Sequence, residues 1–201
     1  MFSKYKIFIE KHVPLNFIEW NIIKSKLKII HYKKGDIIHN IGDVSTQLLF
    51  MNRGLARAYI IDENGKDNTW SVFFNDKNSH MTNLFVVDYE SFINQTPSKL
   101  AIDALEDCEV VCTDYKDVQF LYKNTKKGDN FGRLMAQDAY SYLHNFIITR
   151  QTKNAKERFE AFLHATPYLL DKVPQYHIAT LLGITPQHLS RLKKEFQSDI
   201  K

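Results

Sequence analysis

The sequence predicts an α+β protein that consists of an N-terminal β roll or jelly-roll, a long helix and a C-terminal all-α domain with a helix-turn-helix. Three patterns support this prediction. Short apolar runs broken by turn residues occupy residues 27–122, apolar residues at helical spacing occupy residues 131–147, and residues 173–196 have the pattern of two short helices joined by a turn. We therefore expect a roll at residues 1–127, the long helix at residues 128–150 and the helix-turn-helix domain at residues 151–201.

The first 30 residues alternate apolar with charged side chains, which predicts one or two amphipathic helices interrupted at Pro14. They lack the continuous apolar core of a signal peptide. No apolar run in the sequence approaches the roughly 20 residues that are needed to span a bilayer. We therefore expect a cytoplasmic protein without a membrane partner.

Turn residues divide the next segment into short strands. Glycine-containing turns at residues 33–36, 41–43, 52–54 and 62–65 give spacings of roughly 8 to 12 residues, which are typical of a roll or jelly-roll. Cys108 and Cys112 fall in one of these strands. Four residues along a strand span about 13 Å, which is too far for a disulfide or a shared metal ion, so we expect two small thiols that are buried or half-buried.

Apolar residues recur every three or four positions from residue 131 to residue 147. This spacing predicts one amphipathic helix of about 20 residues. A stripe of this kind most often packs against the core of its own chain. A shorter helix follows from Ala155 to Leu163, and Pro167 ends it. Arg150, Lys153, Lys156 and Arg158 lie in and before this helix and are candidates for phosphate contacts or for a solvated helix face.

Residues 173–184 have the pattern of a helix followed by a tight turn. Ile178 and Leu182 place apolar groups at helical spacing, and Gly183 follows where a helix end can adopt a left-handed conformation. Thr185 can cap the next helix through its hydroxyl group, and Pro186 suits a first helical position. A second helix is therefore expected to begin there.

The second helix has one apolar face, with Leu189, Leu192 and Phe196, and one polar, basic face. In a DNA major groove, a glutamine can pair with adenine and an arginine with guanine. The alternative is an ordinary helical hairpin with a solvated charged face. The residues that we predict to contact DNA are Thr185, Gln187, His188, Ser190, Arg191 and Lys194. For His188 the alternative is a partly buried spacer between the two faces.

The charge distribution agrees with a nucleic-acid partner. The net charge is +4, and residues 150–201 contain 9 of the 27 Lys and Arg residues but 5 of the 23 Asp and Glu residues. The whole basic excess therefore lies in the C-terminal segment. Clustered positive charge of this kind is the footprint of a nucleic-acid-binding module, although a small segment also acquires such an excess by chance.

The segment IATLLGITPQHLSRLKK resembles the helix-turn-helix of Crp/Fnr-type transcription regulators, and the other segments follow the plan of that family over almost the whole chain. The resemblance implies a roll of the cyclic-nucleotide-binding type and a homodimer that binds double-stranded DNA and works with RNA polymerase. In this family the long helix pairs with its twin, and polar residues such as Asp138 and Asn145 would fix the register. The residues that we assign to this dimer helix are Phe131, Leu134, Met135, Tyr142 and Phe146.

The resemblance also locates a ligand cassette. In cAMP-binding members, an acidic residue contacts the ribose, and an arginine followed by a small hydroxyl residue contacts the cyclic phosphate. Here Asp88, Ser98 and Lys99 take these three positions, so the phosphate arginine is missing. We therefore expect no cofactor and no binding of cAMP in the usual way. Lys99 is either a solvated surface residue or a contact for another anionic effector.

Enzyme chemistry is not indicated. The eight histidines do not form a recognised metal-ligand spacing, and no phosphate loop or nucleophile motif occurs, so we expect neither catalysis nor a metal site. His39 stands alone in the roll where a metal-binding cupin enzyme would need partners. The alternative function is a small-ligand sensor whose helix-turn-helix mediates protein contacts only. The histidines are His12, His31, His39, His80, His144, His164, His177 and His188.

Overall fold

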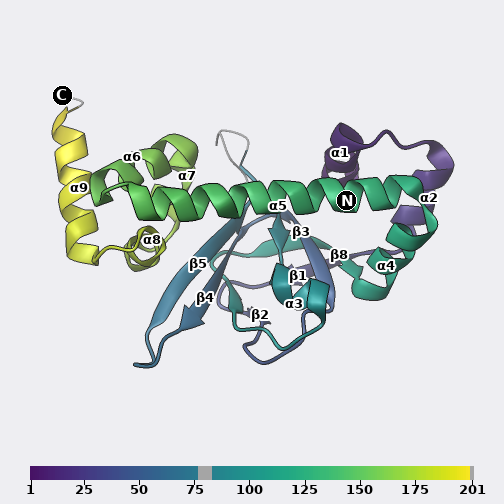
Figure 1. Cartoon of the computed structure of the whole chain (residues 1–201), viewed down its shortest axis with the longest axis horizontal. Coiled ribbons are helices and arrows are strands. Elements are labelled where there is room, and N and C mark those ends of the chain that lie inside the picture. The colour runs from purple at the N-terminus through teal and green to yellow at the C-terminus, as the bar shows by residue number, and fades with distance from the viewer. Residues whose placement is uncertain (77–82, 200–201) are drawn as a thin grey trace.

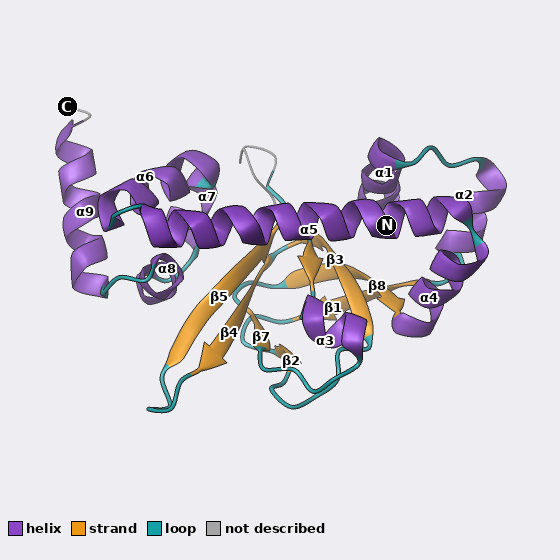
Figure 2. Cartoon of the chain, in the orientation of Figure 1, coloured by secondary structure: helices purple, strands orange, loops and turns teal. Residues whose placement is uncertain are grey.

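The computed structural model describes residues 1–76 and 83–199. Two N-terminal helices, a two-sheet β roll, a long helix and a group of C-terminal helices follow one another along the chain (Figures 1 and 2). The N-terminal helices are α1 (Ser3–His12) and α2 (Phe17–Lys24), with the predicted interruption at Pro14. Asn16 and Glu19 form a reciprocal capping box that starts α2.

The roll consists of two antiparallel sheets that face each other across a common core. One sheet has the order β1-β8-β3-β6 and the other has the order β2-β7-β4-β5. A buried cluster fills the space between them, with Met51 and Cys112 from the first sheet and Ala58 and Ile102 from the second. The strands are β1 (Leu27–Tyr32), β2 (Ile37–His39), β3 (Gln47–Arg53), β4 (Leu55–Ile61), β5 (Asp67–Phe74), β6 (Phe85–Val86), β7 (Ala101–Ala104) and β8 (Cys108–Asp114).

Both cysteines belong to this core, as predicted. Cys108 and Cys112 lie on β8, are buried and form no disulfide. Burial raises the pKa of the Cys112 thiol to about 11. The thiols therefore stay protonated at neutral pH and pack as small apolar groups.

Two short helices complete the roll. Helix α3 (Tyr89–Asn94) lies between β6 and β7, and α4 (Tyr115–Asn124) follows β8. Thr125 then turns the chain into the long helix α5 (Lys126–Thr152), because its hydroxyl group accepts a hydrogen bond of 2.9 Å from the N–H of Gly128. Helix α5 begins two residues before the predicted start and ends two residues after the predicted end. It runs across the whole molecule, from the N-terminal helices to the C-terminal ones (Figure 1).

The C-terminal helices are α6 (Ala155–Ala165), α7 (Pro167–Lys172), α8 (Gln175–Leu182) and α9 (Pro186–Asp199). Their apolar residues form a second core around Phe159, Ile178 and Leu189. This core also includes Val72 and Phe74 of β5. The C-terminal helices are therefore packed directly on one edge of the roll.

Candidate nucleic-acid interface

Helices α8 and α9 form the predicted helix-turn-helix. Ile178 and Leu182 of α8 are buried against Leu189 and Leu192 of α9. Phe196 lies at the edge of this contact, with its ring 6.2 Å from that of Phe159 and 37% of its surface exposed. The apolar faces of both helices are thus used inside the chain, which leaves the polar face of α9 outside.

The turn between the two helices has the predicted chemistry. Gly183 adopts a left-handed conformation, with φ of 67° and ψ of 39°. Thr185 caps α9, since its hydroxyl oxygen accepts a hydrogen bond of 3.2 Å from the N–H of His188. Pro186 is the first residue of α9. These local bonds fix the direction in which α9 leaves the turn.

The six predicted DNA-contact residues lie on or next to the outer side of α9. Thr185, Gln187, Arg191 and Lys194 are exposed, whereas His188 and Ser190 are half-buried. The Arg191 side chain is 69% exposed and lies 3.7 Å from a carboxylate oxygen of Glu195. Helix α9 stands at the far end of the molecule, away from the roll (Figure 1). The basic face of α9 is therefore open to a partner.

The two arginines before the helix-turn-helix have partners within the chain. Arg158 donates hydrogen bonds of 3.0 Å to the carbonyl oxygen of Leu182 and 2.6 Å to that of Lys153. Arg150 donates one of 3.3 Å to the carbonyl oxygen of Leu181. Both guanidinium groups thus satisfy carbonyl groups at the end of α8, where the helix itself offers no donors. Of the four candidate phosphate contacts, these two tie the end of α8 to α5 and α6.

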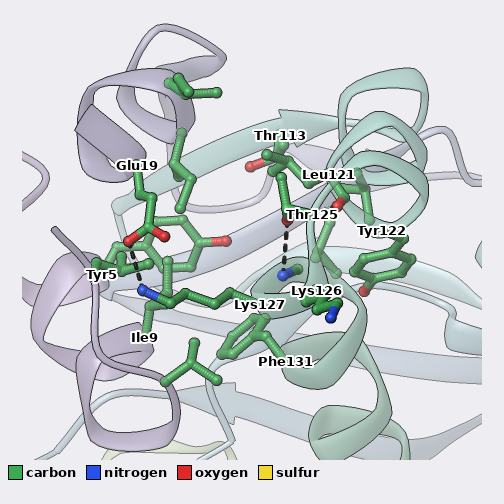
Figure 3. A pocket seen from close by; sticks show the side chains of 17 residues that line it. Tyr5, Ile9, Glu19, Thr113, Leu121, Tyr122, Thr125, Lys126, Lys127 and Phe131 are labelled. Carbon is green, nitrogen blue, oxygen red and sulfur yellow. Dashed lines mark hydrogen bonds and ion pairs between the residues drawn. The ribbon is translucent and has the colours of Figure 1, made fainter. Parts of the chain in front are cut away.

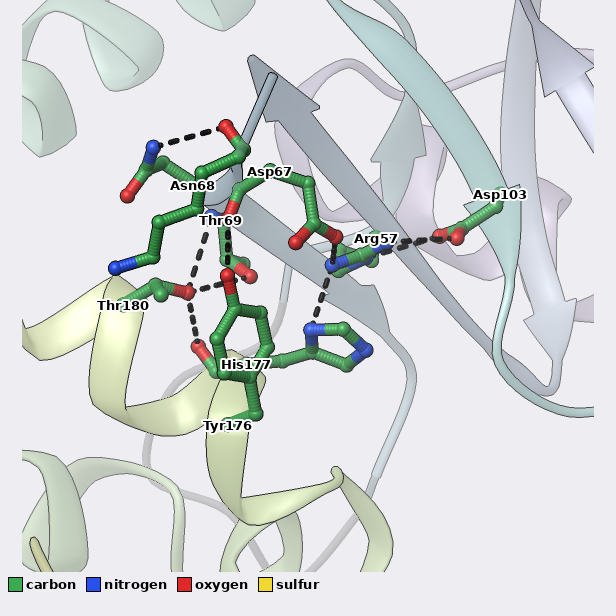
Figure 4. Close-up of polar contacts among 9 residues, drawn as sticks. Arg57, Asp67, Asn68, Thr69, Asp103, Tyr176, His177 and Thr180 are labelled. Atoms are coloured by element: carbon green, nitrogen blue, oxygen red, sulfur yellow. Dashed lines mark hydrogen bonds and ion pairs between the residues drawn. The ribbon is translucent and has the colours of Figure 1, made fainter. Parts of the chain in front are cut away.

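A buried polar cluster attaches α8 to the roll (Figure 4). Arg57 of β4 is 4% exposed and forms two hydrogen bonds to Asp103, of 2.9 and 3.2 Å, and one of 2.6 Å to Asp67. The same guanidinium donates a hydrogen bond of 2.6 Å to Nδ1 of His177 on α8. This bond requires Nδ1 to be unprotonated. Burial first, and the charge of Arg57 second, lower the pKa of His177.

Two further contacts join α8 to β5. The backbone N–H of Thr69 donates a hydrogen bond of 3.1 Å to the hydroxyl group of Thr180, and the Tyr176 hydroxyl group donates one of 2.9 Å to the carbonyl oxygen of Asp67. Sequence reasoning missed this attachment, because the residues of the roll and of α8 are more than 100 positions apart. The one signal in the sequence is that Arg57, Asp67 and Asp103 are charged residues in otherwise apolar strands.

The three predicted ligand residues do not form a common site. Asp88 and Ser98 are buried, and the Ser98 hydroxyl group donates a hydrogen bond of 2.6 Å to Asp88. Asp88 also caps α3 by accepting a bond of 3.4 Å from the N–H of Ser91. Lys99 is exposed, and no ion pair of its ammonium group is found among the described residues. The acidic and hydroxyl groups of the cassette therefore satisfy each other.

A polar cavity of about 390 Å³ lies beside this cassette in the roll. Its described lining includes His39, Asp43, Ser45 and Gln47 but no lysine or arginine. The Nε2 atom of His39 is buried there without a hydrogen-bond partner among the described residues. The lining thus offers no permanent cation to a phosphate group.

A more apolar cavity of about 250 Å³ lies under the N-terminal helices (Figure 3). Ile9, Leu121 and Phe131 are among its walls, and the ring of Tyr5 extends into it. Burial raises the pKa of Tyr5 to about 12. Lys127 forms an ion pair of 2.8 Å with Glu19 of α2, which ties the start of α5 to the N-terminal helices.

The five residues assigned to the dimer helix contact their own chain. Phe131 is buried against α1, and Leu134 and Met135 pack on the same cluster. The rings of Tyr142 and Phe146 are stacked on each other. The ring of Phe146 also forms an edge contact with that of Trp70 on β5. These positions follow the side of α5 that covers the roll.

No group of side chains suited to a metal ion occurs among residues 1–76 and 83–199, and His80 lies outside these ranges. In the same part of the chain, no helix combines the length and apolarity that a membrane crossing requires.

Comparisons with known proteins agree with this architecture. Residues 29–125 match the family model described as cyclic nucleotide-binding domain. No curated protein sequence matches the chain. The structure of FixK2 from Bradyrhizobium japonicum is similar over 86% of this chain and 85% of that one, with 14% identity and a TM-score of 0.72.

Two further solved structures are similar. A putative transcriptional regulator of the Crp/Fnr family from Eubacterium rectale has 21% identity and a TM-score of 0.65 over 92% of this chain and 85% of that one. The c-di-GMP responsive global regulator CLP of Xanthomonas campestris has 14% identity and a TM-score of 0.64 over 90% of this chain and 91% of that one. The predicted fold is therefore confirmed along the length of the chain.

Proposed function

Since this chain has the fold of the Crp/Fnr-type regulators, we propose that it is a cytoplasmic, homodimeric transcription regulator that binds specific double-stranded DNA and has no catalytic role. One observation carries the proposal. Helix α9 has an uncovered face that bears Gln187, Arg191 and Lys194, while its apolar face is packed against α8. Such a helix can enter a major groove without any rearrangement of its own core.

We assign different roles to the residues of this face. Gln187 and Arg191 would read base edges, assisted by His188. Thr185, Ser190 and Lys194 would bind phosphate groups and position the helix. The ion pair between Arg191 and Glu195 is exposed and therefore weak, so it would yield readily to a bidentate contact with guanine.

The dimer would form through α5. Ala136, Tyr140, Leu143 and Ile147 are separated by four, three and four positions and lie on one face of the helix. Tyr140, Leu143 and Ile147 are 71%, 40% and 43% exposed, although all three are largely apolar. We propose that this stripe, named the α5 seam, pairs with its copy in a second chain. Two recognition helices would then meet successive major grooves of a palindromic site.

Two substitutions test the assignment of the DNA-binding face. Arg191→Ala should cost about 1–3 kcal/mol of binding free energy and relax the preference at one base pair. Lys194→Ala should weaken the binding of all sequences alike and reduce the slope of log affinity against log salt by about 1. Fluorescence anisotropy with a selected operator and a scrambled duplex, at several salt concentrations, measures both effects.

Arg133→Ala is the matched control, because Arg133 is an exposed cation on α5 whose hydrogen bonds go to Asn130 and Gln137 of the same helix. It should leave the affinity for DNA unchanged. If Arg191→Ala and Lys194→Ala had no more effect than this control, the DNA-binding face would have been misassigned.

We further propose that cAMP is not the effector. The cassette lacks the phosphate arginine, and its buried Asp88 and Ser98 are bonded to each other. Titration calorimetry with cAMP and cGMP should therefore give no saturable heat at micromolar ligand. Micromolar binding of either nucleotide would contradict this part of the proposal.

Regulation would proceed through contacts of the DNA-bound dimer with RNA polymerase.

A further inference from the structure

We propose that a cavity at the junction of the roll, α5 and the helix-turn-helix binds a small aromatic carboxylate and thereby controls the affinity for DNA. The cavity, named the junction cavity, has a volume of about 300 Å³. The inference rests on the proposed function for its regulatory part, whereas binding of the carboxylate can be measured without DNA.

The junction cavity lies where all three parts of the molecule meet. Phe74 of β5, Phe146 of α5, Phe162 of α6 and Leu182 of α8 each contribute to its wall. Within the described part of the chain, it shares no lining residue with the polar cavity of the roll or with the cavity under the N-terminal helices. A molecule bound here would contact the roll, the long helix and the DNA-binding helices at once.

The walls favour an aromatic ligand. The rings of Tyr142 and Phe146 are nearly parallel, at an angle of 18° with centroids 6.4 Å apart. Most of the remaining lining is apolar, including Val72 and Leu169. An apolar cavity of about 150 Å³ can hold benzene, so the junction cavity has room for an aromatic ring with a short side chain.

The charge of the lining specifies an anionic group on the ligand. Among the described residues that line the cavity, Arg150 and Arg158 are the only charged ones, and none is an aspartate or glutamate. A guanidinium group offers two parallel N–H donors that match a carboxylate. A carboxylate bound beside these two side chains would therefore meet two cations and no opposing anion.

Arg150 connects the cavity to the DNA-binding turn. Its bond to the carbonyl oxygen of Leu181 is long, at 3.3 Å, and its guanidinium lies against Gly183, where an added Cβ atom would come within 2.9 Å of Nη2. An ion-paired hydrogen bond to a carboxylate is stronger than this long bond to an uncharged carbonyl oxygen. Bound carboxylate would therefore draw Arg150 away from the end of α8 and shift the turn that orients α9.

Trp70 provides a direct measurement of binding, because its ring lies 6.3 Å from that of Phe146. The chain has two tryptophans, so Trp20→Phe leaves Trp70 as the only reporter. The full-length Trp20→Phe protein is titrated with 3-phenylpropionate and, separately, with the uncharged 3-phenylpropanol. We expect a saturable change in Trp70 emission with the acid and at least tenfold weaker binding of the alcohol. Equal affinities, or no saturable binding of the acid, would overturn the inference.

Three substitutions in the Trp20→Phe background locate the site. Arg150→Gln should weaken binding of 3-phenylpropionate at least tenfold, and Ala161→Phe should abolish it by filling the cavity. Arg133→Gln, on the same helix but outside the cavity, should have no effect. Unfolding curves verify that each variant is folded. If Ala161→Phe is unstable, the affinity of Arg150→Gln alone decides whether 3-phenylpropionate binds in the junction cavity. Unchanged affinity in Arg150→Gln would place the ligand elsewhere and refute the proposal.

The regulatory part is tested by repeating the DNA titrations with saturating 3-phenylpropionate. We expect a change in operator affinity of roughly 5-fold or more, which is an ordinary allosteric coupling. This change should be lost in Arg150→Gln. Operator affinity that stays constant would contradict the control of DNA binding. A protein that binds the acid but no DNA would refute the proposed function alone.

Discussion

Gly183 lies where α8, the turn to α9 and the guanidinium of Arg150 meet. Its φ of 67° is a conformation that side chains with a Cβ atom rarely adopt. Its N–H bonds to the carbonyl oxygen of Thr180, and the N–H of Ile184 bonds to that of Ala179. A single residue therefore ends one helix and sets the direction of the next.

Replacing this glycine should affect both stability and DNA binding. Gly183→Ala should lower the free energy of unfolding by about 1 kcal/mol because of the left-handed conformation, as measured by urea denaturation. The new methyl group should also displace Arg150 and weaken operator binding. Gly65→Ala is the matched control, since Gly65 has a φ of 75° and a methyl group added there would meet no described atom within 4 Å. If Gly65→Ala weakened operator binding as much, the turn would not be the cause.

At the scale of elements, the contact between α8 and β5 determines how the helix-turn-helix sits on the roll. Its centre is the buried Arg57, which holds Asp67 and Asp103 of the roll and His177 of α8. The two carboxylates more than offset the guanidinium charge, and the neutral imidazole accepts a further N–H of the same guanidinium. The attachment is therefore sensitive to the protonation of one side chain.

The attachment should weaken in mild acid. The pKa of His177 is lowered in the folded protein, so below about pH 6.5 the unfolded chain binds more protons than the folded one. This contribution to stability is complete above that pH and is lost as the pH falls toward the folded-state pKa. The groups that face His177 are Arg57, which lowers its pKa, and Asp67 and Asp103, which partly oppose that effect.

His177→Gln tests this pH dependence, because glutamine is a neutral acceptor at all pH values. Between pH 7.5 and 5.5, the native protein should lose more free energy of unfolding than the His177→Gln protein does. Urea denaturation at both pH values gives the two differences. Equal losses in the two proteins would mean that His177 does not carry the effect.

At the scale of the whole molecule, α5 contributes to two surfaces at once. Phe131 and Phe146 lie on the side that packs on the chain itself. The α5 seam lies on another side, where Tyr140 and Leu143 remain exposed. Pairing of two seams would bury these apolar side chains, which gives the dimer a hydrophobic driving force.

A charge on the seam should separate the dimer. Light scattering after size exclusion should give about twice the chain mass of 23.6 kDa for the native protein. Leu143→Glu should shift the mass toward that of one chain, because the carboxylate would be buried opposite its own copy. Ser141→Glu, which adds the same charge outside the seam, should remain dimeric. A native protein that is strictly monomeric would remove the basis for paired recognition helices.

The sequence by itself determined the long helix, the helix-turn-helix and the uncovered face of α9, but it did not predict α3, α4 or α7. Apolar spacing and turn chemistry are local, so Ile178, Gly183, Thr185 and Leu189 predicted both helices, the turn and the buried face. The same local reasoning predicted the strands and turns of the roll, and the two buried thiols within it. Helix α5 starts two residues before the predicted position, because the capping bond to Thr125 depends on where α4 ends, and it also ends two residues later than predicted.

Only the tertiary structure decided which groups from distant parts of the chain meet. Amphipathic α5 has apolar residues on more than one side, so its sequence does not say which side covers the roll; the packing of Phe131 and Phe146 does. The bond between Arg57 and His177 spans 120 positions and depends on how β4 and α8 come together. Local patterns specify helices and turns through short-range sterics and hydrogen bonds, whereas such contacts follow from the burial of whole faces against one another.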